Sequence, residues 1–111
     1  MPPSKGADVV LGDRFCRSAA PWLTAEAVAL AKDAGFTCEA NDPFAGGHIL
    51  DRHGSPQGAV HAIQIEIDRG CYLTASGDPG GRFDEVAALI ETLTMRLGTA
   101  LLERRTAAAA E

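Results

Sequence analysis

The chain has 111 residues, which is enough for one small domain but not for two. Its formal net charge is -5, and this acidic balance argues against a nucleic-acid-binding protein, because such proteins carry a basic face. The charge still allows a small anionic substrate to be held by one or two local arginines. Only 5% of the residues are aromatic, so aliphatic side chains must build the core.

The cysteine pattern and the hydropathy pattern indicate the compartment. Cys16, Cys38 and Cys71 are widely spaced, odd in number and form no Cys-x-x-Cys pair, so we expect reduced thiols that fill space as small hydrophobes. No basic and then apolar leader opens the chain, and no apolar run reaches the roughly 20 residues that cross a bilayer. The sequence therefore predicts a cytoplasmic protein that binds no membrane.

The first part of the chain predicts a strand, a helix and a second strand. Asp8–Leu11 is a short apolar run that a glycine stops, as in a buried strand. A helix is expected over Ala25–Ala34, with Thr24 as its N-cap and Gly35 just after its end. Phe36–Ala40 is predicted to be the second strand. This order is typical of a parallel crossover unit.

A long irregular segment, Asn41–Gly58, separates this unit from the strongest strand signal. Structureless connections of this length in a compact domain are usually functional, and a short helix is expected around Gly47–Arg52. Ala59–Ile67 is predicted to be a strand because its side chains alternate. One face carries His61, Ile63, Ile65 and Ile67, and the other carries Val60, Ala62, Gln64 and Glu66.

The last part of the chain predicts a loop over Gly70–Gly81 and a long helix over Arg82–Arg105. The helix has an apolar stripe at helical spacing that we assign to core packing. The stripe consists of Val86, Leu89, Ile90, Leu93, Leu97, Leu101 and Leu102. We predict a single α/β domain over residues 1–105, with a partial mixed or parallel sheet and flanking helices, and a disordered tail over 106–111.

Glu66 is the first candidate for chemistry. A carboxylate near the end of an apolar strand faces a desolvation cost, and open α/β sheets place their sites at the carboxyl ends of strands. A carboxyl group in a site at the end of a strand suits general acid–base catalysis. A salt bridge or a solvated strand face explains the same pattern. Gln64, on the same face, either orients Glu66 or faces water.

Two loops provide the other candidates. Gly46 and Gly47 follow the turn at Asp42-Pro43 and would let the backbone approach a ligand closely, although an ordinary surface loop has the same composition. Arg14 follows the first strand and offers a planar fork that can hold a carboxylate. A surface ion pair between Arg14 and an acidic neighbour is the alternative.

The histidines do not form a recognisable metal motif. His48 and His53 are five positions apart, whereas two ligands on one helical face are four apart. His61 falls on the isoleucine face, where we expect a hydrogen-bonded core or supporting residue. The residue pattern also contains no nucleophile elbow, P-loop or dinucleotide fingerprint.

Three segments together resemble the N-formylglutamate amidohydrolase family. They are Gly12–Phe15 (Gly-Asp-Arg-Phe), Asn41–Gly47 (Asn-Asp-Pro-Phe-Ala-Gly-Gly) and His61–Arg69 (His-Ala-Ile-Gln-Ile-Glu-Ile-Asp-Arg). The resemblance runs from about Ala7 to Leu73, in the family's order. It implies an α/β fold similar to that of zinc carboxypeptidases. It also implies hydrolysis of N-formyl-L-glutamate to glutamate and formate, often in histidine breakdown.

The resemblance also implies roles for single residues. Glu66 matches the general acid/base, and Arg14 matches a residue suited to a substrate carboxylate. Asn41, Gly46 and Gly47 match the loop that would close over the substrate. Gln64 completes the expected substrate-binding set beside Glu66. The implied small-molecule partner is therefore an acylated amino acid.

Family members are longer than this chain, and the metal ligands of the family lie upstream of the matching region. Met1-Pro2 resembles the Met-Pro that follows the last of those ligands. The resemblance implies zinc or a similar divalent metal whose ligands are not in this chain. We therefore expect a fragment or one half of a split protein that is inactive alone. The alternative is a non-catalytic remnant that self-associates, or binds a partner, through an exposed sheet edge.

Overall fold

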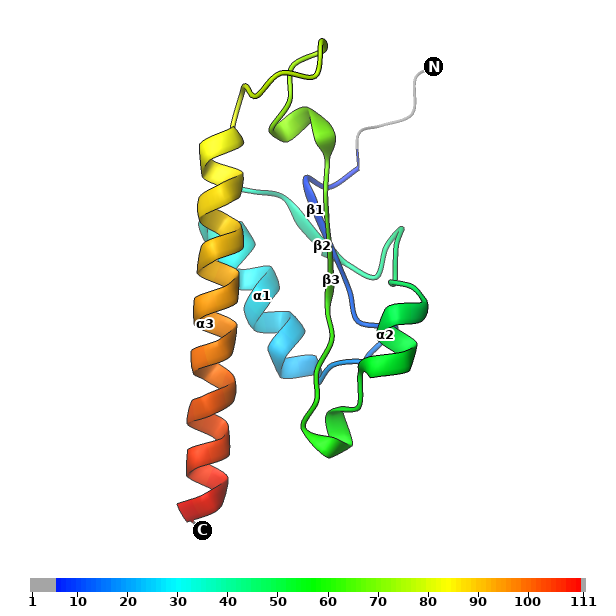
Figure 1. Ribbon diagram of the computed structural model, residues 1–111, viewed down its shortest axis with the longest axis vertical. Coiled ribbons are helices and arrows are strands. Elements are labelled where there is room, and N and C mark those ends of the chain that lie inside the picture. Colours follow the sequence, from blue (N-terminus) through cyan, green and yellow to red (C-terminus); the bar gives the residue numbers. More distant parts are fainter. Residues whose placement is uncertain (1–5, 111) are drawn as a thin grey trace.

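The computed structural model describes residues 6–110, with side chains up to Arg105, and Figure 1 shows the arrangement of the elements. The expectation about Met1-Pro2 lies outside the described residues. In chain order the helices and strands are β1 (Val9–Gly12), α1 (Pro21–Asp33), β2 (Cys38–Ala40), α2 (His48–His53), β3 (Gln64–Ile67) and α3 (Phe83–Ala110). Short 3-10 turns cover Pro56–Gly58 and Arg69–Cys71.

The three strands form one mixed sheet in the order β2-β1-β3. Strand β1 is parallel to β2, with Val9 opposite Cys38, and antiparallel to β3, with Val10 opposite Glu66. The parallel crossover unit and the mixed sheet with flanking helices are confirmed. Gln64, the first residue of β3, lies opposite Gly12, the last residue of β1, so the long connection after β2 stays at the end of the sheet where β1 and β2 end, and β3 runs back antiparallel.

Strand β3 is shorter than the sequence predicts, because it begins at Gln64 and not at Ala59. The preceding residues bond elsewhere. Val60 exchanges backbone hydrogen bonds with Ser55 (2.6 and 3.0 Å), and the Ala62 N–H donates to the carbonyl of Ser18 (2.8 Å). This part of the chain is therefore anchored to the loop after β1 and not to β1 itself.

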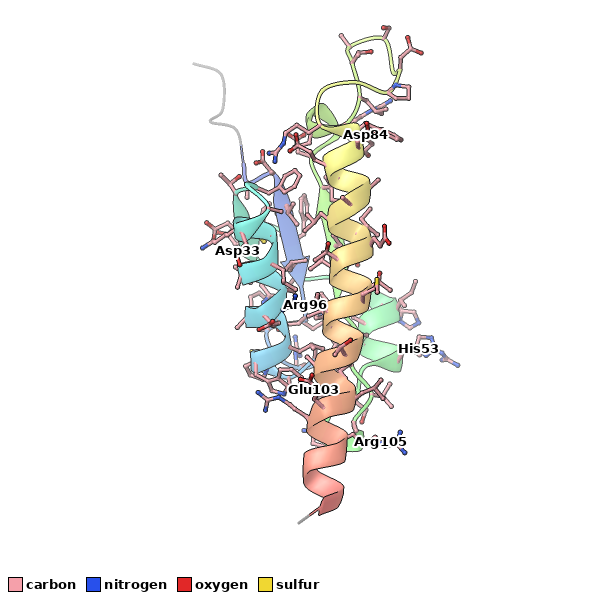
Figure 2. The ribbon with its side chains drawn as sticks, turned by 90° about the vertical axis from the view of Figure 1, so that its left-hand side faces the viewer. Asp33, His53, Asp84, Arg96, Glu103 and Arg105 are labelled. Carbon is pink, nitrogen blue, oxygen red and sulfur yellow. The ribbon has the colours of Figure 1, made fainter. Side chains whose placement is uncertain are left out.

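Helices α1 and α3 lie side by side and cover one face of the sheet (Figure 2). The core between them consists of Val9, Leu11, Ala27, Ala31, Phe36, Cys38, Cys71, Val86, Leu89 and Leu93. The apolar stripe predicted for α3 is buried at its first positions but wrong at two others. Ile90 is 46% exposed and Leu102 is 64% exposed, because α3 borders the last strand and extends past the sheet.

The start of α1 differs from the prediction and its end agrees with it. The helix begins at Pro21, whose fixed φ suits the first helical position, so Thr24 lies inside the helix and is not the N-cap. Gly35 has φ of +88° just after the helix, as predicted. Its N–H donates to the carbonyl of Lys32 (2.9 Å), and Phe36 N–H donates to that of Ala31 (3.1 Å), which is the Schellman arrangement.

Two arginines fix the ends of α1: Arg82, just before α3, and Arg104, within α3. The guanidinium of Arg82 lies 3.7 Å from the centre of the Phe36 ring and donates to two carbonyl oxygens at the end of α1 (3.1 and 3.2 Å). The guanidinium of Arg104 lies 3.7 Å from the centre of the Trp22 ring, at the start of α1. Directed contacts thus hold the two helices together at both ends.

Helix α3 continues to Ala110, beyond the end at Arg105 that the sequence suggests, so the segment predicted to be a disordered tail is helical through Ala110. Alanine has the highest helix propensity, which accounts for the extension. Cys38 and Cys71 are buried as expected, but Cys16 is exposed. Within residues 6–110, no helix is long and apolar enough to span a bilayer.

Candidate functional site

The face of the sheet opposite α1 and α3 carries the polar candidates. Successive residues of a strand point to opposite sides, so Gln64 and Glu66 lie on this face while Ile65 and Ile67 lie on the helical side. Val10 of β1 lies opposite Glu66, and Gly12 lies opposite Gln64. The predicted division of β3 into an aliphatic face and a polar face is confirmed for these residues.

Glu66 is half-buried in a shallow pocket of about 250 Å³. Val10, Pro43 and Phe44 supply apolar walls, and Asp68 is a second carboxylate in the lining. The side-chain amide of Gln64 donates to Oε1 of Glu66 at 2.7 Å. Of the two roles expected for Gln64, the structure shows the one in which it orients Glu66.

The Asn41–Gly47 loop lies against the end of β1, at Gly12. A Cβ atom at Gly12 would be 2.6 Å from the carbonyl carbon of Ala45, so only glycine permits this approach. Gly46 has φ of +97°, and a Cβ there would collide with the side chain of Leu50. Gly47 has no atom within 4 Å of such a Cβ, so the special backbone predicted for the glycine pair belongs to Gly46.

A buried carboxylate, Asp13, ties the ends of β1 and β2 together. Asp13 is only 1% exposed. Oδ1 accepts from the Asn41 side-chain amide (2.8 Å) and from the Cys16 N–H (2.9 Å), and Oδ2 accepts from the Thr24 hydroxyl (2.7 Å). Oδ1 of Asn41 in turn accepts from the N–H groups of Asp13 (3.0 Å) and Phe15 (3.3 Å).

The electrostatics of Asp13 favour its ionised form. Burial, the largest single influence, would raise the pKa of Asp13, but hydrogen bonds from Cys16, Thr24 and Asn41 together hold that pKa below its usual value. The network also stabilises an unusual backbone. Arg14, Phe15 and Cys16 have φ of 54°, 55° and 70°, a left-handed stretch that costs roughly 1 kcal/mol or more per residue.

Arg14 lies in the same corner and is already paired. Its Nε donates to Oδ1 of Asp51 on α2 at 3.0 Å, and its Nη1 donates to the carbonyl of Gly46 at 3.1 Å. The ion pair is partly exposed, with side-chain exposures of 27% and 48%. The partner is neither Asp13 nor a glutamate, the neighbours that the sequence suggested. Nη2 makes no hydrogen bond to any residue in the described part of the chain.

The structure therefore places the candidates in two groups. Gln64 and Glu66 are joined by a hydrogen bond, and Arg14 contacts Gly46 in a corner that also contains Asn41. Arg14 is not part of the lining of the Glu66 pocket. The expected convergence of all of them is met only in part, because Pro43 and Phe44 of the Asn41–Gly47 loop do line that pocket.

Along the sheet, Glu66 lies at the level of Val10 and Gln64 lies at the level of Gly12. Two strand residues span roughly 7 Å. Gln64 is therefore at the carboxyl end of β1, and Arg14 begins the left-handed turn two residues after that end.

The histidines belong to neither group. Nδ1 of His61 accepts from the N–H of Ala20 at 3.1 Å, and its ring meets that of Trp22 edge-on, with centroids 6.4 Å apart. His61 is thus a hydrogen-bonded supporting residue, as predicted. His53 points away from the body of the molecule (Figure 2). Within the described residues, no three His, Cys, Asp or Glu side chains cluster closely enough to hold a metal, so these residues alone do not fit a metal centre.

The sequence did not point to two residues of the site, Asp13 and Asp51. Asp13 follows β1 and Asn41 follows β2, and parallel neighbouring strands end at the same edge, so the predicted topology already implied that these side chains meet. Asp51, which pairs with Arg14, is 37 positions away and gives no local signal.

Comparisons with known proteins agree on one family. The model of the family described as N-formylglutamate amidohydrolase matches residues 1–73. The N-formylglutamate deformylase of Pseudomonas aeruginosa is 38% identical over 68 residues, which are 60% of this chain and 25% of that protein. The crystal structure of N-formylglutamate amidohydrolase from Ralstonia eutropha JMP134 superposes with a TM-score of 0.74 at 28% identity, covering 96% of this chain and 38% of that chain. The present chain thus spans less than half the length of these relatives.

Proposed function

The chain belongs to the N-formylglutamate amidohydrolase family, and from this premise we propose that it forms the substrate-facing part of a hydrolase that converts N-formyl-L-glutamate and water to glutamate and formate. The observation that carries the proposal is the position of Glu66. Its carboxylate lines a pocket on the polar face of the sheet and is oriented by Gln64 at 2.7 Å.

Glu66 is proposed as the general acid/base. Its carboxylate would accept a proton from the attacking water as the water oxygen bonds to the formyl carbon. It would then deliver that proton to the amide nitrogen as the carbon–nitrogen bond breaks. The hydrogen bond from Gln64 occupies Oε1, so Oε2 is the oxygen that would handle the proton. The apolar walls from Val10 and Phe44 would limit access of bulk water.

Arg14 is proposed to bind a carboxylate of the substrate. Guanidinium groups bind carboxylates through paired hydrogen bonds, and Nη2 of Arg14 is available for this among the described residues. The substrate would share the guanidinium with Asp51 or displace it. Asn41, Gly46 and Gly47 are proposed to form the wall on the other side, in the position that the Asp13 network fixes.

The resemblance implies a divalent metal ion such as zinc. The described residues do not supply a ligand set, so the ion would be held by residues outside them, and no step above passes through it. Since the chain spans only part of its relatives, we propose that activity requires more of the domain than this chain provides. We also propose a cytoplasmic location, and a complete domain with the fold of zinc carboxypeptidases.

Formate release tests the proposal. The chain would be mixed with a polypeptide covering the part of the P. aeruginosa deformylase that lies outside the aligned segment, with zinc and N-formyl-L-glutamate. We expect formate from the mixture and none from either part alone. N-formyl-L-glutamine, which lacks the side-chain carboxylate, should react at least about tenfold more slowly if Arg14 binds that group. A mixture that forms a complex but releases no formate would refute the activity and favour the non-catalytic binding module.

A further inference from the structure

The two edges of the sheet differ in how they are protected. Strand β2 has three residues, with Cys38 buried and Glu39 exposed, so its edge is short and charged. Strand β3 has four residues, and its side chains on the helical side are Ile65 and Ile67. Ile65 is 39% exposed. Short strands and charges discourage further pairing, whereas an exposed aliphatic edge invites it.

Strand β3 directs backbone N–H and C=O groups toward its free edge, on the side away from β1. The N–H of Asp68 donates to the carbonyl of Asp8 at 2.8 Å. Residues of an antiparallel pair alternate between bonding to the partner and pointing away from it, so Glu66 bonds to β1. The N–H and C=O groups of Ile65 and Ile67 therefore point away from β1, toward an edge at which no strand pairs within residues 6–110.

An apolar groove of about 390 Å³ runs along the same edge, between β3 and α3. Ile65 and Ile67 form one wall. Phe83 and Ile90, which are 41% and 46% exposed, contribute the other wall from α3. A second hollow of about 190 Å³ continues past Ile65 along α3. Phe83 and Ile90, which the core does not bury, thus border the free edge of the sheet.

We propose that this edge and groove bind an extended apolar strand from the part of an N-formylglutamate amidohydrolase domain that this chain does not span. An added strand would satisfy the backbone groups of Ile65 and Ile67 and place its alternate side chains over the groove. The Ralstonia eutropha enzyme contains a similar structural unit within a longer chain. We expect the added strand to come from the remainder of such a chain. The inference rests on family membership and is independent of the proposed hydrolysis.

A second copy of this chain fits the edge less well. Each copy has a formal net charge of -5, so a dimer would bring two acidic chains together. Pairing two β3 strands would also place two Glu66 carboxylates near each other on one face of the joined sheet, and like charges across neighbouring strands are destabilising.

Binding and amide exchange test this inference without requiring turnover. The full chain would be titrated with the polypeptide from the P. aeruginosa deformylase described above, with size-exclusion chromatography and light scattering to determine stoichiometry. We expect a one-to-one complex and at least about tenfold slower hydrogen exchange at the amides of Ile65 and Ile67. Ile65→Lys should weaken binding by at least about tenfold. Leu102→Lys is the matched control, since Leu102 is 64% exposed on α3 outside the groove.

Three results would overturn the inference. They are the absence of a complex, a complex that leaves exchange at Ile65 and Ile67 unchanged, and a stable dimer of this chain that protects those amides and resists the added polypeptide. The exchange measurement uses the unmodified chain, so it decides the question even if Ile65→Lys misfolds. A complex that protects β3 but releases no formate would support this inference and refute the hydrolysis.

Discussion

The aliphatic core and the polar groups around the sheet are held by different kinds of interaction. Under α1 and α3, aliphatic side chains close the core, and Leu11, Leu89 and Leu93 are at most 2% exposed. The positions of Glu66, on the opposite face, and of Asp13, buried against α1 at the end of β1, depend on directed hydrogen bonds. Aliphatic packing depends on volume, whereas a hydrogen-bond network depends on individual atoms and on protonation. The core and the polar groups should therefore respond differently to mutation and to pH.

The largest effect on stability is expected in the aliphatic core. Leu93→Ala should lower the free energy of unfolding by about 2–5 kcal/mol, because it removes buried contacts and leaves a cavity. Leu102→Ala, on the same helix at 64% exposure, should cost less than about 1 kcal/mol. Urea denaturation of the full chain followed by circular dichroism measures both. Equal losses would show that the core does not lie where the structure places it.

A smaller effect with a distinct pH dependence is expected in the hydrogen-bond network of Asp13. Asp13→Ala should cost about 2–3 kcal/mol at neutral pH, because the donors of Cys16, Thr24 and Asn41 lose their acceptor. The pKa of Asp13 is lowered in the folded chain, so its stabilisation is fully present above about pH 4 and is lost as the pH falls through the folded pKa.

Urea titrations at several acidic pH values check this sign. The unmodified chain should lose stability toward acid more steeply than Asp13→Ala, because the variant lacks the group that becomes protonated. Leu93→Ala should keep the steep dependence of the unmodified chain. If Asp13→Ala and the unmodified chain had parallel pH profiles, Asp13 would not be the anionic centre of the network.

The smallest effects concern the arginines that hold α1 against α3. Arg82→Ala should cost about 1–2 kcal/mol, because Arg82 contacts the Phe36 ring and also donates to two carbonyl oxygens at the end of α1. Arg104→Ala should cost about 0.5–1 kcal/mol, because it loses only the contact with Trp22. Thermal unfolding at equal protein concentration compares the two variants. A larger loss for Arg104→Ala would reverse this ranking.

The core and the polar groups also differ in how well the sequence predicted them. Periodicity predicted α3 and the alternation of Ile65 and Glu66, because these patterns follow from local geometry. Glycine chemistry predicted the end of α1 at Gly35. The aliphatic side of the fold was therefore largely predictable, apart from Ile90, which borders the open edge, and Leu102, which lies past the sheet.

The contacts of the polar groups were less predictable because they join distant segments. Thr24 looked like a helix cap, but Pro21 starts the helix earlier and turns Thr24 toward Asp13. The pairing of Arg14 with Asp51 joins residues 37 positions apart, and no local rule anticipates it. The three motifs that resemble the family lie within the segment that the family model matches, but residue types alone could not show that β3 runs antiparallel to β1.

The most direct test of the central claim compares two glutamates on the same face of the sheet. Formate release from N-formyl-L-glutamate would be measured in the two-part mixture with Glu66→Gln and, separately, with Glu39→Gln, which alters an exposed residue of β2. We expect Glu66→Gln to slow release by at least about 100-fold and Glu39→Gln to leave the rate unchanged. A Glu66→Gln mixture that releases formate at the unmodified rate would contradict this expectation.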